Sequence, residues 1–132
     1  RIPDTHLVMH GSSSVPQDWL KIINDFGGDM GQTYGVPVTE IQEGIKNGVR
    51  KVNIDTDLRM ASTGAVRRHL VENSSNFDPR KFLKEATNAM SDICADRFEA
   101  FGSAGNADKI SVSSLDTMSQ RYASGELDAN VK

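Results

Sequence analysis

The sequence predicts an α/β fold in which two short parallel strands alternate with amphipathic helices. Residues 7–10 form a short apolar run, residues 50–54 are a second strand candidate, and both break abruptly into polar turns, as buried parallel strands do. The stretches between and after them repeat apolar residues at helical spacing. The 132 residues allow one domain, but two parallel strands cannot form a self-sufficient sheet. We therefore expect residues 1–132 to be one segment of a larger α/β domain.

The first strand candidate is followed by two helices. A helix over 15–26 opens with Val-Pro, since proline is tolerated at the first helical position. The glycines at 27–28 end it, because glycine accepts left-handed backbone angles. Residues 29–37 are expected to form a loop. A short helix then starts at 39–42, where the first and fourth residues fit a capping box, and Gly48 stops it.

The second strand candidate also runs directly into a helix. Residues 50–54 break at 55–57, where Asp-Thr-Asp is a strong N-cap signal. The helix that begins there is expected to continue to about Leu70. A polar turn over 73–77 follows it.

The longest helix is predicted to begin at Asp78-Pro79 and to carry an apolar stripe that includes Cys94. As the single cysteine, Cys94 cannot form an internal disulfide, which suits a reducing cytosol. We interpret it as a small buried hydrophobic residue. A loop over 102–109 and a last helix over 113–123 complete the chain.

Composition excludes several classes of partner. Net charge is −3 with a pI near 5.5, so nothing favours nucleic acid or an anionic membrane surface. No apolar run approaches the roughly 20 residues of a membrane span, and the start lacks a signal peptide and an initiator methionine. We therefore expect a cytoplasmic protein and a segment of a longer chain. Any bound anion must be held by backbone N–H groups, helix ends or a well-placed arginine.

The motif with the most chemistry is His10-Gly11-Ser12-Ser13-Ser14, at the end of the first strand. Ligands of α/β folds bind at the carboxyl ends of the strands. An imidazole placed there can ligate a metal through one nitrogen. The glycine and serines offer N–H and hydroxyl donors to phosphate oxygens. The alternative is a strand-end histidine followed by a flexible turn.

Two further motifs suit an anionic substrate. Asn53 to Asp57 ends the second strand and opens a helix, where free N–H groups attract anions and Thr56 adds a hydroxyl. We expect either Asp55 or Asp57 to cap the helix and the other to accept hydrogen bonds from substrate hydroxyls; plain helix capping is the alternative. Arg80 lies beside the positive end of the longest helix, which favours a phosphate opposite it, although an ordinary solvated arginine also fits.

These motifs together resemble class II, metal-dependent fructose-1,6-bisphosphate aldolases, and in particular the bacterial subgroup that includes Calvin-cycle enzymes. The resemblance covers essentially the whole chain, and the occurrence of the motifs in this order is highly specific. Ser12-Ser13 after His10-Gly11 points to that subgroup. The matching stretches are 7–16, 34–37, 48–57, 78–80, 98–105 and 121–125.

The resemblance implies a (β/α)₈ barrel of about 250 residues or more, of which this chain would be the C-terminal part with the last two strands. It also implies that His10 is one of three zinc ligands. Gly11, Ser12 and Ser13 would grip the phosphate of dihydroxyacetone phosphate. Asn53, Asp55 and Thr56, at the end of the second strand, would hold the same ketose. Arg80 would reach the other substrate phosphate from a neighbouring subunit.

The implied reaction is reversible cleavage of fructose 1,6-bisphosphate by a zinc-dependent enediolate mechanism in a homo-oligomer, a dimer or tetramer. Zinc or another divalent metal would be the cofactor, with a monovalent cation as a further candidate. The catalytic aspartate and the other two histidines are expected upstream, so none is assigned here. The alternatives are a relative acting on tagatose or sedoheptulose bisphosphate, or an inactive fragment of the aldolase.

Overall fold

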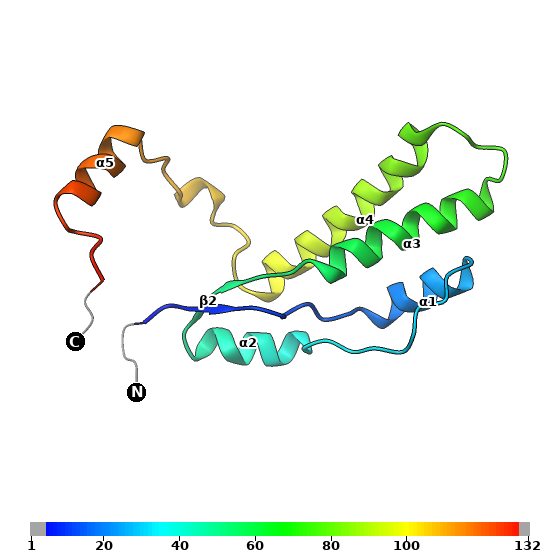
Figure 1. Ribbon diagram of the computed structural model, residues 1–132, viewed down its shortest axis with the longest axis horizontal. Coiled ribbons are helices and arrows are strands. Elements are labelled where there is room, and N and C mark those ends of the chain that lie inside the picture. The colour runs from blue at the N-terminus through cyan, green and yellow to red at the C-terminus, as the bar shows by residue number, and fades with distance from the viewer. Residues whose placement is uncertain (1–4, 130–132) are drawn as a thin grey trace.

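The computed structural model describes residues 5–129. Its centre is a two-stranded parallel sheet of β1 (Leu7–Met9) and β2 (Val49–Val52), with α2 (Val38–Lys46) packed along β2 (Figure 1). The backbone N–H of Asn53 donates to the Met9 carbonyl at 3.0 Å, so the pairing continues beyond both strands. The predicted α/β class and the parallel pair are therefore confirmed. The paired residues are Leu7 with Val49, Val8 with Lys51 and Met9 with Val52.

The connection between the strands contains the two predicted helices. α1 (Gln17–Asp25) begins after Pro16. It ends at Asp25, two residues before Gly27, whose φ is +85°, and the Gly28 N–H donates to the Ile23 carbonyl. The predicted capping box at 39–42 is wrong. α2 begins at Val38, one residue after Pro37, and no side chain caps it, because the fixed φ of proline already suits a helix start.

Two long helices form an antiparallel hairpin that extends away from the sheet (Figure 1). α3 (Thr56–Glu72) leaves the end of β2, and α4 (Pro79–Ala100) returns along it. α4 begins at Pro79, as the sequence predicts, and Asp78 caps it by accepting the Arg80 backbone N–H at 3.0 Å. Within residues 5–129, no helix is both long and apolar enough to cross a membrane.

The core lies where the hairpin meets α1. One buried cluster joins the hairpin helices to each other, and a second joins α1 to α3. Trp19 packs against both. Gly64 allows this approach, since a Cβ there would lie 2.8 Å from the Trp19 ring. The two clusters are Ala61, Ala65, Ala89 and Ile93, and Val15, Leu20, Ile23 and Met60.

The C-terminal stretch lies apart from the sheet and the hairpin (Figure 1). The loop after α4 contains a short 3₁₀ turn, η1 (Ala107–Lys109), and leads to α5 (Leu115–Ala123). Ser114 caps α5 by accepting the Thr117 N–H at 3.1 Å. No residue of α5 is buried, and Leu115 is 89% exposed.

We expect this chain alone to fold poorly. A sheet of two parallel strands leaves an unpaired edge on each strand, and Val8 of β1 is 50% exposed. Purified residues 1–132 should therefore unfold without a cooperative transition and should associate with increasing concentration. Thermal denaturation followed by circular dichroism, together with light scattering, measures both properties. A sharp transition from a monodisperse monomer would contradict this expectation.

Candidate functional site

The two predicted motifs meet at the carboxyl edge of the sheet. Because β1 and β2 are parallel, the residues that follow them emerge on the same side. His10 follows β1 and Asn53 follows β2, and Asn53 Nδ2 lies 2.8 Å from His10 Nδ1. His10 is exposed, whereas Asn53 is half-buried. An amide can serve either imidazole tautomer, since it carries both donors and an acceptor, so Asn53 orients the ring of His10.

The turn after His10 is partly tied to the sheet and partly open. Ser12 is fully buried, and its hydroxyl contacts the carbonyl oxygens of Met9 at 3.1 Å and Asn53 at 2.7 Å. That hydroxyl therefore joins the two strand ends. Gly11 has a φ of +64°, and a Cβ built on it would meet no atom within 4 Å. There is thus open space directly beside the backbone of the turn.

Ser13 connects the turn to the start of α3. Its Oγ accepts the backbone N–H groups of Asp55 at 3.2 Å and Thr56 at 3.1 Å. The expectation that Asp55 or Asp57 caps this helix is wrong, because no side-chain cap bond comes from the N-cap residue Asp55 and the cap is supplied by Ser13. Ser13 lies more than 40 positions before α3 in the sequence, so this cap joins the turn after His10 to the end of the second strand.

The remaining residues at this edge are exposed. The Asp55 carboxylate pairs with Arg59 one turn along α3, with Nε donating to Oδ1 at 2.9 Å. Thr56 is also exposed. The Asn53 amide lies beside the imidazole of His10, and the Asp55 carboxylate and the Thr56 hydroxyl belong to the same strand end. Together these groups offer both donors and acceptors to a polyhydroxylated ligand.

A buried ion pair behind the turn was not predicted. Asp57 is fully buried and accepts the N–H and hydroxyl of Ser14, at 3.0 and 2.8 Å, and the N–H of Val15 at 2.9 Å. Arg97 of α4 donates to the Ser14 hydroxyl at 2.8 Å and lies 3.3 Å from the Asp57 carboxylate. The only sequence signal was that Arg97 falls one turn after Ile93, on the apolar stripe of the helix.

The loop before α2 closes the other side of the turn. The Val36 N–H donates to the Ser13 carbonyl at 3.0 Å. A Cβ at Gly35 would lie 2.0 Å from that same carbonyl oxygen, so only glycine permits this approach. The predicted loop over 29–37 is thus part of the site's support.

Arg80 lies away from these residues. It is in the first turn of α4, at the far end of the hairpin, and its side chain is 89% exposed. α3 has 17 residues, which separates the two ends of the hairpin by about 25 Å. Arg80 pairs with Asp78, with Nε donating to Oδ1 at 3.0 Å. This hydrogen bond, and then the Arg80 backbone N–H, hold the pKa of Asp78 below its usual value, while Asp78 raises the pKa of Arg80.

The described residues contain no group of three His, Cys, Asp or Glu side chains that could hold a metal ion. His10 nevertheless fits a zinc ion as a single ligand. Its side chain is exposed, and Asn53 contacts the ring at Nδ1. With the amide turned so that its oxygen accepts the Nδ1 proton, Nε2 is left free for a metal, and the second ring nitrogen of a histidine ligand is usually held in this way. Since catalytic zinc takes three protein ligands, the described residues supply at most part of a zinc site.

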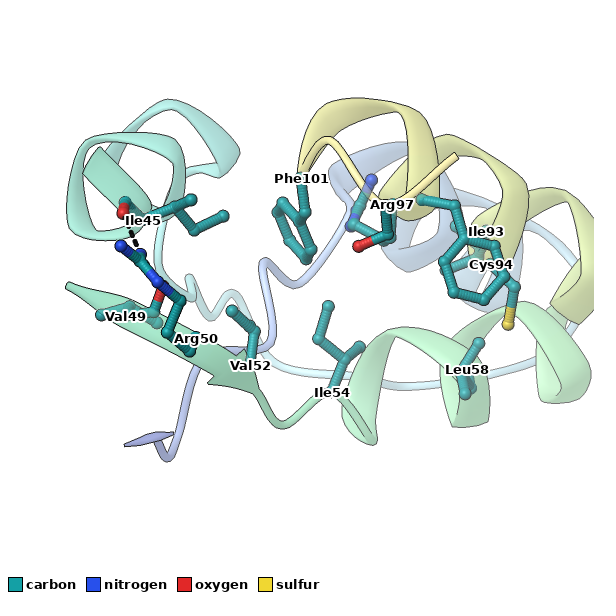
Figure 2. A pocket seen from close by; sticks show the side chains of 12 residues that line it. Ile45, Val49, Arg50, Val52, Ile54, Leu58, Ile93, Cys94, Arg97 and Phe101 are labelled. Atoms are coloured by element: carbon teal, nitrogen blue, oxygen red, sulfur yellow. Dashed lines mark hydrogen bonds between the residues drawn. The ribbon is translucent and has the colours of Figure 1, made fainter. Parts of the chain in front are cut away.

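The main apolar pocket lies elsewhere. An apolar pocket of about 320 Å³ lies between α2, β2 and α4 (Figure 2). It contains none of the predicted site residues. Cys94, predicted to be buried, is half-buried in its wall. The lining includes Val52, Ile54, Leu58, Arg97 and Phe101.

The fold and the site thus define an α/β protein with an imidazole, polar side chains and an open glycine-serine turn at the carboxyl edge of parallel strands. A family model described as "Fructose-bisphosphate aldolase class-II" matches residues 1–106. This chain belongs to the class-II fructose-bisphosphate aldolase family, as its motifs indicate.

Curated relatives carry the same name. The chain is 70% identical to the fructose-bisphosphate aldolases of Stutzerimonas stutzeri and Pseudomonas aeruginosa PAO1, over 131 residues in each case. These matches cover 99% of this chain and 37% of each relative. The Xanthobacter flavus aldolase is 64% identical over 127 residues, which are 96% of this chain and 36% of the relative. The chain thus spans little more than a third of the length of these relatives.

Proposed function

We propose that this chain supplies part of the active site of a class II aldolase that reversibly cleaves fructose 1,6-bisphosphate to dihydroxyacetone phosphate and glyceraldehyde 3-phosphate. The observation that carries the proposal is the meeting of His10 and Asn53 across β1 and β2, beside the open turn at Gly11. The rest of a (β/α)₈ barrel, including the catalytic aspartate, would come from sequence outside these 132 residues.

In this proposal His10 is one of three histidine ligands of zinc, and Asn53 holds its ring. When bound, the zinc ion would supply Lewis-acid stabilisation of the negative charge that develops on the ketose during an enediolate mechanism. The imidazole is oriented before a ligand arrives, because its contact with Asn53 is within the protein. Such preorganisation limits the loss of freedom on binding.

The phosphate of the ketose would lie over the turn after His10. Backbone N–H groups of Gly11, Ser12 and Ser13 are the donors we assign to it, because the Ser12 hydroxyl already contacts two carbonyl oxygens and the Ser13 hydroxyl caps α3. The Thr56 hydroxyl would add a donor at the positive end of α3. A net charge of −3 gives the chain no general attraction for phosphate, so these local donors must provide it.

The hydroxyls of the ketose would contact Asn53 and Asp55. An amide and a carboxylate offer acceptors to hydroxyl protons, and both side chains belong to the same strand end. Asp55 is held by Arg59, which fixes its orientation while leaving it exposed. Phosphate and hydroxyl contacts together would hold the reacting carbons next to the His10 imidazole.

A full-length hybrid tests the proposed function directly. In it, this chain replaces the matching 37% of the Pseudomonas aeruginosa aldolase. We expect the hybrid to cleave fructose 1,6-bisphosphate within about tenfold of the parent kcat/KM, a cost of about 1.4 kcal/mol, and to lose activity when its metal is removed by a chelator. Coupled measurement of triose phosphate release follows the reaction. A folded, metal-loaded hybrid without aldol cleavage would refute the proposal.

A further inference from the structure

We propose that the buried pair of Asp57 and Arg97 is a positioning device that sets the backbone of the turn from Gly11 to Val15, and thereby the affinity of the site for phosphate. The inference rests on the proposed function, since that turn is the proposed phosphate-binding element. Neither residue is placed against the ligand, because both lie behind the turn.

The contacts of Asp57 are concentrated on two consecutive residues of the turn. Its two carboxylate oxygens accept the backbone N–H groups of Ser14 and Val15 and the Ser14 hydroxyl, at distances of 2.8 to 3.0 Å. Asp57 is fully buried, so these hydrogen bonds do not compete with water. They set the direction in which the chain leaves the turn and enters α1.

The turn needs such restraint because its backbone is strained. Val15 has a φ of +54°, a conformation that β-branched residues rarely adopt. It is the only non-glycine residue with a positive φ among residues 5–129. Its N–H donates to Asp57 at 2.9 Å. A strained residue persists only when its surroundings fix it, and Asp57 provides that restraint.

Arg97 brings α4 into the same arrangement. It donates to the Ser14 hydroxyl from 83 positions along the chain, and its charge faces Asp57. On its other side Arg97 lines the apolar pocket (Figure 2), and its buried Nε has no hydrogen-bond partner among the described residues. Burying a guanidinium in this way contributes little net stability. Its contact with the turn therefore points to positioning rather than to stabilisation of the fold.

The experiment compares variants of the full-length hybrid. Arg97→Met keeps the length of the side chain but removes the charge and donors, while Arg97→Lys keeps the charge. We expect Arg97→Met to raise both the KM for fructose 1,6-bisphosphate and the Kd for inorganic phosphate about tenfold, because a displaced turn would lose the equivalent of one hydrogen bond to the charged phosphate. Zinc content and kcat should change less than about twofold, since the machinery near His10 is untouched. Arg97→Lys should recover most of the affinity for both.

Lys84→Met is the matched control, because it removes an exposed cation from the same helix, and it should change neither constant. A lowered melting temperature with unchanged KM and Kd would overturn the inference and leave the pair a purely structural element. An inactive but folded parent hybrid would instead contradict the proposed function. Phosphate affinity measured by calorimetry still tests the positioning role in that case, and equal Kd values for parent and Arg97→Met would reject it.

Discussion

Replacing His10 with alanine in the full-length hybrid is expected to lower kcat for fructose 1,6-bisphosphate cleavage about 1,000-fold, equivalent to about 4 kcal/mol of transition-state stabilisation. The reason is that a catalytic zinc site with three protein ligands does not tolerate the loss of one. Bound zinc, measured by atomic absorption after dialysis, should fall well below one per chain. The free energy of unfolding should change little in the metal-free protein, because the His10 side chain is exposed.

His6→Ala is the matched control for this variant. His6 lies four residues earlier and is also exposed, but it precedes β1 and therefore lies at the opposite end of the strand from the site. It should retain zinc and activity at the parent level. Stoichiometric zinc and full activity in His10→Ala would remove His10 from the metal site, whatever the behaviour of the control.

The sequence predicted the elements that depend on local signals. Both strands were predicted, from the runs 7–10 and 50–54, because stretches this short between polar turns have the length of strands rather than of helices. The Asp78-Pro79 signal gave the start of α4 at the correct residue. The capping box at 39–42 failed because a competing local signal, Pro37, starts α2 two residues earlier than the predicted N-cap at Thr39. In that case two local signals conflicted and the nearer proline prevailed.

Only the site residues that directly follow the two strands could be predicted from the sequence. His10 and Asn53 were found because parallel strands place their carboxyl ends at one edge of a sheet. The cap of α3 by Ser13 and the pairing of Asp57 with Arg97 were missed, since these contacts join residues 40 or more positions apart. Each residue had a plausible local role in the sequence, Ser13 as a phosphate donor and Asp57 as a helix cap. Tertiary packing gave them different partners, which spacing alone does not reveal.

The second large effect is expected at Arg80, which we propose binds a substrate phosphate in a neighbouring subunit. Arg80 cannot reach the site of its own chain, because the length of α3, about 25 Å, separates them. Its side chain is 89% exposed and held by Asp78, so it is available to an anion on another molecule. Loss of a bidentate, charge-assisted phosphate contact costs about 1.5–3 kcal/mol. Arg80→Ala should therefore lower kcat/KM for the bisphosphate about 10- to 100-fold.

This loss should depend on the substrate. Proton exchange of dihydroxyacetone phosphate requires only the phosphate over the turn at Gly11, so Arg80→Ala should leave that exchange within about twofold of the parent. Lys81→Ala is the matched control, since it removes the adjacent exposed cation of α4, and it should affect neither reaction. Equal losses in cleavage and exchange would mean that Arg80 binds the phosphate over the turn at Gly11 and not the other phosphate of the bisphosphate.

Mixing subunits decides whether Arg80 acts across an interface. In a mixed dimer of Arg80→Ala and His10→Ala chains, one site receives His10 from the first chain and Arg80 from the second, and the other site carries both defects. Random exchange makes about half of the dimers mixed, so activity should rise to about one quarter of the parent value. That is about 2.5- to 25-fold above the 1–10% expected for Arg80→Ala alone. Affinity tags of two kinds verify that mixing has occurred. Mixed dimers without recovered activity would show that Arg80 does not serve the neighbouring site, because an arginine acting within its own chain leaves every site of the mixture with one defect.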